Sequence, residues 1–170
     1  MRKHTIGKLL LTTSLIAGAL GLTGCHGSRG QSGFTVPEDF DTSRNYEITF
    51  WAKNDTNKTQ TEIYKKAIED FEELYPNITV NLRLYTDYGK IYNDVITNIA
   101  TDTTPNVCIT YPDHIATYLT GSNVVVPLDT LFTNEKYGLD GSELLFDGPT
   151  QEEIIPKFLK ECEFNGHYYA

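Results

Sequence analysis

The feature that most constrains the fold is a regular alternation of strand-like and helix-like patterns in the middle of the chain. Residues 46–52 are rich in β-branched and aromatic side chains, and residues 78–85 alternate apolar with polar ones, so both are predicted strands. Residues 63–74 and 88–99 carry apolar side chains at the spacing of amphipathic helices. Residues 107–111 form an almost continuous apolar run, which predicts a short strand buried on both faces.

This order predicts an α/β fold with a mainly parallel sheet flanked by helices. Such sheets bind ligands beyond the carboxyl ends of their strands. Three polar loops follow the predicted strands, at residues 53–55, 86–88 and 112–114. We therefore expect a ligand site to be built from these loops.

Shorter signals predict the remaining elements. Asp87 is a predicted N-cap, and Pro76 marks the end of the helix before it. The last third of the chain carries four such patterns: a short helix at 114–119, an extended segment at 124–128, a capping box at 150–153 that opens a helix to about 162 with Pro156 as a candidate kink, and an Asn165-Gly166 hairpin turn.

The first residues have the pattern of a secretory signal. Residues 1–25 carry three basic residues and no acid, and the apolar run Leu9–Leu22 is shorter than the roughly 20 residues that cross a bilayer. The run ends at Leu22-Thr23-Gly24-Cys25, which resembles the bacterial lipobox. That resemblance implies cleavage after residue 24 and a diacylglyceryl group on Cys25; an uncleaved anchor helix is the alternative.

Three segments are therefore expected. Residues 1–24 form a lipoprotein signal peptide, and residues 25–45 form a lipidated cysteine with a flexible Gly- and Ser-rich tether, whose reach is on the order of 25 Å. Residues 46–170 form the α/β body. Cys108 and Cys162 could pair or remain thiols, because their spacing in sequence does not determine their separation in space.

Composition excludes one class of partner. With 14 Lys and Arg against 23 Asp and Glu, the formal net charge is −9, which argues against nucleic acid because phosphate binding needs a basic surface.

Several segments in order resemble the extracellular solute-binding proteins of ABC importers, in the sugar-binding family that includes maltose-binding protein. The matching segments are 48–51, 67–80 with its Phe-Glu and Tyr-Pro pairs, 104–107, 126–129 and the Asn-Gly-x-x-Tyr-Ala sequence at 165–170. The resemblance implies a type II periplasmic-binding-protein-like fold with two lobes, of which this chain is an incomplete first lobe with the second lobe missing. A complete small domain is the alternative.

The resemblance also implies a function. A lipid-anchored monomer on the outer face of the cell membrane would capture a mono- or oligosaccharide and deliver it to the permease subunits, without a cofactor or a metal. Asp113 would be an acidic sugar ligand, followed by His114 where a basic residue often stands. Lys53, Asn54 and Asp55 would supply polar ligands.

The chemistry of sugars agrees with these residue types. Carboxylates and amides bind paired hydroxyls, and aromatic faces cover the C–H surface of a sugar ring. Tyr88, Tyr111 and Trp51 are the candidate aromatics, although Trp51 could equally pack in the core, as we expect for Tyr92 and Tyr118. Asp113 could also cap a helix.

Two other functions remain open, a secreted carbohydrate-active hydrolase and an adhesion lipoprotein. The sequence has no Gly-x-Ser-x-Gly, His-Glu-x-x-His or Gly-rich phosphate loop, which argues against the common hydrolases. We therefore expect a binding protein that is not an enzyme.

Overall fold

The computed structural model describes residues 34–54, 58–121 and 124–169. The predictions for Cys25, for Asp55 and for the signal peptide lie outside these ranges. In chain order the elements are β1 (Tyr46–Lys53), α1 (Lys58–Leu74), β2 (Ile78–Tyr85), α2 (Tyr88–Ile99), β3 (Val107–Cys108), α3 (Pro112–Tyr118), α4 (Asp129–Phe132), η1 (Gln151–Glu153), α5 (Pro156–Glu161), β4 (Glu163–Phe164) and β5 (His167–Tyr168).

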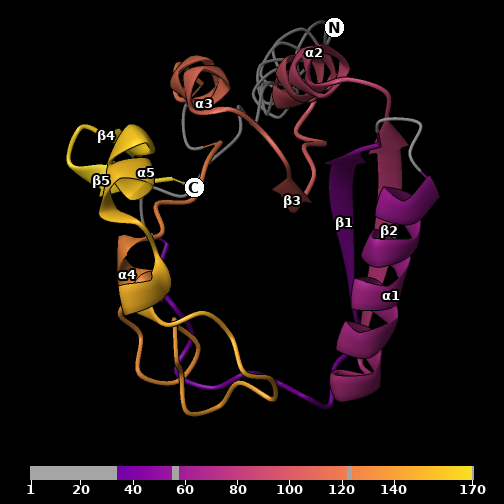
Figure 1. Cartoon of the computed structure of the whole chain (residues 1–170), viewed down its shortest axis with the longest axis vertical. Helices are drawn as coiled ribbons and strands as arrows, with labels where there is room; N and C mark the ends of the chain where they lie inside the picture. The colour runs from indigo at the N-terminus through magenta and orange to yellow at the C-terminus, as the bar shows by residue number, and fades with distance from the viewer. Residues whose placement is uncertain (1–33, 55–57, 122–123, 170) are drawn as a thin grey trace, which may run out of the picture.

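The first three strands form a parallel sheet, as predicted, and their order is β2-β1-β3. β1 and β2 are paired over their whole length, from Tyr46 opposite Ile78 to Lys53 opposite Tyr85. Their carboxyl ends lie at the top of Figure 1, close to α2, while α1 runs along the sheet. Strands that are parallel and in register end together, so the loops after β1 and β2 are brought to one edge.

The core lies between the sheet and α2. Trp51 and Tyr85 contribute from the strands, Ile91 and Val95 from α2, and Tyr118 from α3. The opposite face of β1 packs on α1, where the Phe50 and Tyr64 rings meet edge to face at 5.8 Å. The two helices therefore cover opposite faces of the sheet, as in other α/β folds.

β3 differs from the prediction. It covers only Val107 and Cys108, and Val107 is 51% exposed rather than buried. Within the described residues β3 pairs with β1 alone, so the outer edge of β3 has no neighbouring strand. The side chains of β3 are therefore less covered than those of a central strand. Pro112 then begins α3, which ends the extended conformation at Tyr111.

Helix caps agree with the sequence at one position and differ at another. Asp87 caps α2, and its Oδ1 atom accepts a hydrogen bond of 2.8 Å from the Lys90 backbone N–H. Asp113 is not the cap of α3: Tyr111 holds that position, and Asp113 lies inside the first turn. An acidic side chain there is favourable because it faces the positive end of the helix dipole.

The last third of the chain is more irregular than predicted. Residues 124–128 form no strand, and the predicted helix is divided into η1 and α5. Glu153 accepts from the Thr150 backbone N–H, as a capping box requires. Pro156 is the first residue of α5, where its missing N–H costs nothing, rather than a kink inside a helix.

The Asn165-Gly166 hairpin is confirmed, since both turn residues have positive φ and β4 pairs with β5.

Cys108 and Cys162 are both free thiols.

Residues 34–45 have no helix or strand, but they contact the body. Phe40 stacks on Tyr46 and donates its backbone N–H to the Tyr137 hydroxyl at 2.8 Å. Lys136 binds the Asp39 carboxylate at 2.6 Å. No helix in the described part of the chain is long and apolar enough to span a bilayer.

Candidate functional site

Three of the predicted ligand residues meet at the carboxyl ends of the strands. The Nζ atom of Lys53, the last residue of β1, lies 5.2 Å from the ring centroid of Tyr88, the first residue of α2. The Tyr88 ring in turn lies 4.2 Å from that of Tyr111, which directly precedes α3. Three segments distant in sequence thus meet at one surface, to which Tyr88 and Tyr111 contribute rings and Lys53 a cation.

His114 extends this surface. Its ring lies 5.5 Å from Tyr111, edge to face, and 4.5 Å from Tyr92. Tyr92 was expected in the core, and it does pack against the core while half-buried. Tyr92 follows Tyr88 by four residues, so both rings lie on one side of α2. This spacing is visible in the sequence and could have grouped Tyr92 with Tyr88.

The polar candidates flank the aromatic surface. Asn54 donates its backbone N–H to the Tyr85 carbonyl at 2.7 Å and its side-chain amide to Thr61 at 2.6 Å. Its Oδ1 atom is buried and has no hydrogen-bond partner in the described structure. Asp113 is exposed in the first turn of α3 and accepts from the His114 backbone N–H at 3.1 Å. Asp55 lies outside the described residues.

Trp51 is separated from this surface. It is 6% exposed and packs on Tyr85, with ring centroids 5.4 Å apart, while the Arg83 guanidinium lies 4.9 Å from its ring. Trp51 therefore belongs to the core beneath the site. Core packing was one of the two roles expected for it, and stacking on a sugar was the other.

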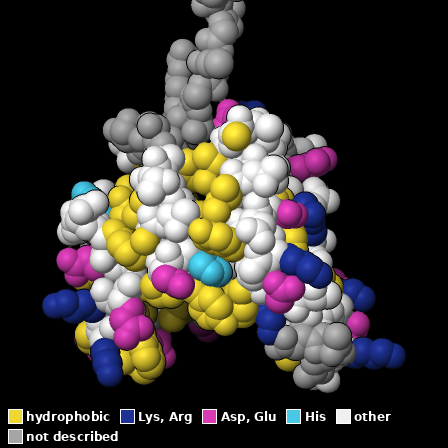
Figure 2. Space-filling view, turned by 90° about the horizontal axis from the view of Figure 1, so that it is seen from above, with side chains coloured by type: hydrophobic (Ala, Val, Ile, Leu, Met, Phe, Trp, Pro, Cys, Tyr) yellow, Lys and Arg dark blue, Asp and Glu magenta, His cyan; other side chains and the backbone are white. Residues whose placement is uncertain are grey.

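Figure 2 shows the face that lies at the top of Figure 1. Apolar side chains gather around its hollowed middle, and charged side chains lie mainly toward its edges. Below this face, burial raises the pKa of Tyr118 and of the Cys108 thiol, so both remain protonated at neutral pH. No group of three or more His, Cys, Asp or Glu side chains in the described ranges could hold a metal ion.

A large apolar groove in the described part of the chain lies elsewhere. It has a volume of about 660 Å³ and lies near the amino ends of the strands. None of the predicted ligand residues lines it; its apolar lining includes Phe34, Phe40, Phe71, Leu131, Tyr137 and Phe146. The predicted site follows from the rule for α/β sheets, which places ligands at the carboxyl edge, and does not coincide with this groove.

The parallel sheet, the helices on both of its faces and the polar and aromatic surface at its carboxyl edge define a lobe of periplasmic-binding-protein-like architecture. The sequence profile of the family described as "Bacterial extracellular solute-binding protein" matches residues 55–155, more than half of the chain. The chain belongs to this family. The description of the family indicates a location outside the cytoplasm.

Solved structures share the fold at low sequence identity. An extracellular solute-binding protein family 1 member from Alicyclobacillus acidocaldarius matches 74% of this chain and 27% of its own length, with a TM-score of 0.56 and 17% identity. The GacH receptor of Streptomyces glaucescens, solved unliganded and with acarbose, matches 74% and 28%, with a TM-score of 0.52 and 20% identity.

A de novo designed esterase shares the fold to the same degree, with a TM-score of 0.56 and 19% identity over 73% of this chain and 26% of its own. The chain thus spans about a quarter of the length of the solved structures that it matches. A search of curated protein sequences finds no match.

Proposed function

We propose that the protein is the substrate-binding lipoprotein of an ABC transporter, which captures a carbohydrate outside the cell membrane and delivers it to the permease. Membership of the solute-binding family supports the binding role. The GacH receptor, which has this fold, was solved with acarbose, and that supports a carbohydrate as the ligand.

One observation carries the carbohydrate proposal. Tyr111 is 48% exposed at the carboxyl edge of the sheet, and the Tyr88 ring packs against its ring with centroids 4.2 Å apart. A supported, half-exposed aromatic ring beside polar side chains suits a sugar, whose ring has an apolar C–H face and a rim of hydroxyls.

Each ligand residue then has a chemical role. Tyr111 stacks on the sugar ring, and the Asp113 carboxylate accepts hydrogen bonds from hydroxyl groups. Asn54 is the polar member of the site beside Lys53. Lys53 and His114 donate to sugar oxygens. The other proposed members are Tyr88, as the support of Tyr111, and Asp55; Trp51 supports the site from the core.

The second half of the binding cleft is also part of the proposal. We propose that residues 46–170 form the first of two lobes that close around the sugar, in a complete gene product that is more than twice as long. The isolated chain then binds the same sugar weakly or not at all, because binding to one wall leaves most of the sugar surface in water. Tight binding by residues 46–170 alone would contradict the two-lobe arrangement.

Anchoring by Cys25 completes the proposal. The lipobox-like sequence and the tether would hold the binding protein, as a monomer, close to the permease. Metabolic labelling with a palmitate analogue should mark the wild-type protein, and the label should be lost in Cys25→Ala. Labelling that persists in Cys25→Ala would rule out this anchor.

The function is tested with the complete gene product and a panel of maltotetraose, isomaltotetraose, xylotetraose and cellotetraose. At least one of these should raise the melting temperature, and chromatography after long incubation should recover it unchanged. Cleavage of the bound sugar would show a hydrolase instead.

A further inference from the structure

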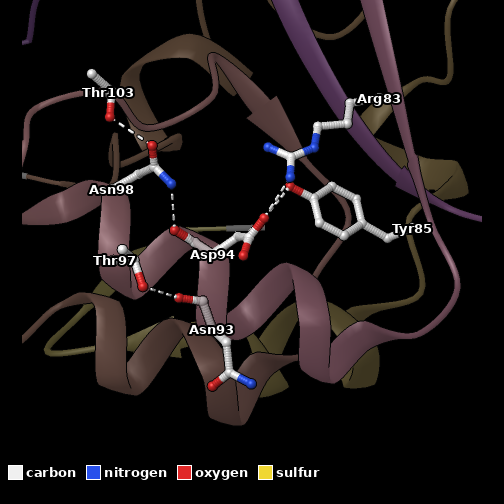
Figure 3. Close-up of polar contacts among 7 residues, drawn as sticks. All are labelled: Arg83, Tyr85, Asn93, Asp94, Thr97, Asn98 and Thr103. Atoms are coloured by element: carbon white, nitrogen blue, oxygen red, sulfur yellow. Dashed lines mark hydrogen bonds and ion pairs between the residues drawn. The ribbon is translucent and has the colours of Figure 1, made fainter.

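A cluster of polar side chains ties α2 to the sheet directly beneath the candidate site. Arg83 and Tyr85 on β2 both donate to the same oxygen of Asp94 on α2 (Figure 3). The Arg83 Nη2 atom lies 2.7 Å and the Tyr85 hydroxyl 2.9 Å from Asp94 Oδ2. A single carboxylate oxygen thus receives two bonds from one strand.

Aromatic packing fixes the Arg83 side chain. Its Cζ atom lies 4.9 Å from the Trp51 ring centroid and 4.6 Å from the Tyr85 ring centroid. Trp51 is opposite Arg83 in the register of β1 and β2, so the guanidinium bridges both strands and the helix. Cation–π contacts of this kind hold an arginine in one position even where it is half-exposed.

The cluster is also connected to the site. Tyr85 is opposite Lys53 in the strand register, and its carbonyl accepts from the Asn54 backbone N–H at 2.7 Å. Asp94 belongs to the same helix as Tyr88, whose ring lies between Lys53 and Tyr111. The rotation of α2 therefore sets where the Tyr88 ring stands.

Apolar packing alone does not fix that rotation. Ile91 and Val95 hold α2 close to the sheet, but apolar contacts have little directional preference. Hydrogen bonds weaken steeply when they are misaligned, so the two bonds to Asp94 oppose rolling of the helix.

We propose that Arg83, Tyr85 and Asp94 are positioning residues, which orient α2 so that Tyr88 supports Tyr111 in the sugar-binding arrangement. This inference rests on the proposed function. None of the three touches the ligand; they act through Tyr88 and the strand ends.

The test compares Arg83→Met, Tyr85→Phe and wild type in the complete gene product. Each variant should weaken binding of the tightest tetrasaccharide of the panel by about fivefold, with Arg83→Lys partly restoring affinity. Nuclear Overhauser contacts between the Tyr88 and Tyr111 ring protons should weaken in parallel. Lys66→Met is the matched control, because Lys66 also pairs with an aspartate on its helix, on the other side of the sheet.

Unchanged sugar affinity in Arg83→Met would overturn the positioning role. So would Tyr88–Tyr111 ring contacts that persist while both the affinity and the melting temperature fall. An equal loss of affinity in Lys66→Met would also overturn it. If wild type binds none of the four sugars, the proposed function fails. The ring contacts in Arg83→Met then still decide the positioning role by themselves.

Discussion

The ring centroids of Tyr88 and Tyr111 lie 4.2 Å apart, with their planes tilted by 39°. The two tyrosines come from different elements, and Lys53 approaches Tyr88 to 5.2 Å. Tyr88 is therefore engaged by the protein itself, whereas Tyr111 keeps 48% of its surface exposed. This difference assigns direct stacking to Tyr111 and support to Tyr88.

Replacing Tyr111 by alanine should weaken sugar binding about tenfold, equivalent to ~1.4 kcal/mol, because the stacking surface is lost. Tyr111→Phe should bind within about twofold of wild type, since it keeps the ring. Calorimetric titration measures both. Tyr46→Ala, at the other end of β1, is the control for general destabilisation, and equal affinity of wild type and Tyr111→Ala would contradict the stacking role.

Asp113→Ala should also weaken sugar binding, by about tenfold or more, because a charge-assisted hydrogen bond contributes ~1.5–3 kcal/mol. Asp113→Asn should fall between wild type and Asp113→Ala, since its amide oxygen still accepts. The same titration with Glu47→Gln controls for the change in net charge, because Glu47 is also exposed but lies on β1, away from the site. An Asp113→Ala variant with wild-type affinity would remove Asp113 from the site.

Asp87→Ala should lower the free energy of unfolding by about 1 kcal/mol, because the Lys90 backbone N–H loses its acceptor. Asp87→Asn should cost less, since asparagine caps helices almost as well. Urea unfolding followed by circular dichroism measures the difference. Equal stability of Asp87→Ala and Asp87→Asn would show that the cap is not needed.

The free energy of unfolding should decrease at alkaline pH, because the Tyr85 phenol loses its proton more readily in the unfolded chain than in the folded one. Burial, followed by the hydrogen bond to Asp94, raises the pKa of the Tyr85 phenol above its usual value. The unfolded phenol ionises near pH ~10 while the folded one keeps its proton, so this stabilisation is complete below about pH 10 and is lost as the pH rises further. The melting temperature of wild type should therefore fall more steeply above about pH 10 than that of Tyr85→Phe. An equal fall of the two melting temperatures with pH would contradict this role of Tyr85.

The sheet and its two covering helices could be predicted because local pattern and final environment agree there. The alternation of residues 78–85 and the helical spacing of residues 88–99 both reflect one buried face. At residues 107–111 the pattern was misleading. Their apolar run predicts a buried strand, but only β1 lies beside it in the described structure and Pro112 starts a helix.

The site was partly predictable for a geometrical reason. Parallel strands end at one edge, so Lys53, Tyr88 and Tyr111 could be grouped from their places after successive strands. The role of Arg83 could not be predicted, because its contacts with Trp51 and Asp94 depend on strand register and helix rotation. Neither property is visible in residue spacing alone.

Carbohydrate binding by the complete gene product is tested most directly by isothermal titration calorimetry with the four tetrasaccharides. Saturable binding of at least one sugar is expected, with one site per chain and a micromolar dissociation constant that Tyr111→Ala raises about tenfold. Absence of saturable binding for every sugar, together with tight binding of a peptide or a metal ion by the same protein, would contradict it.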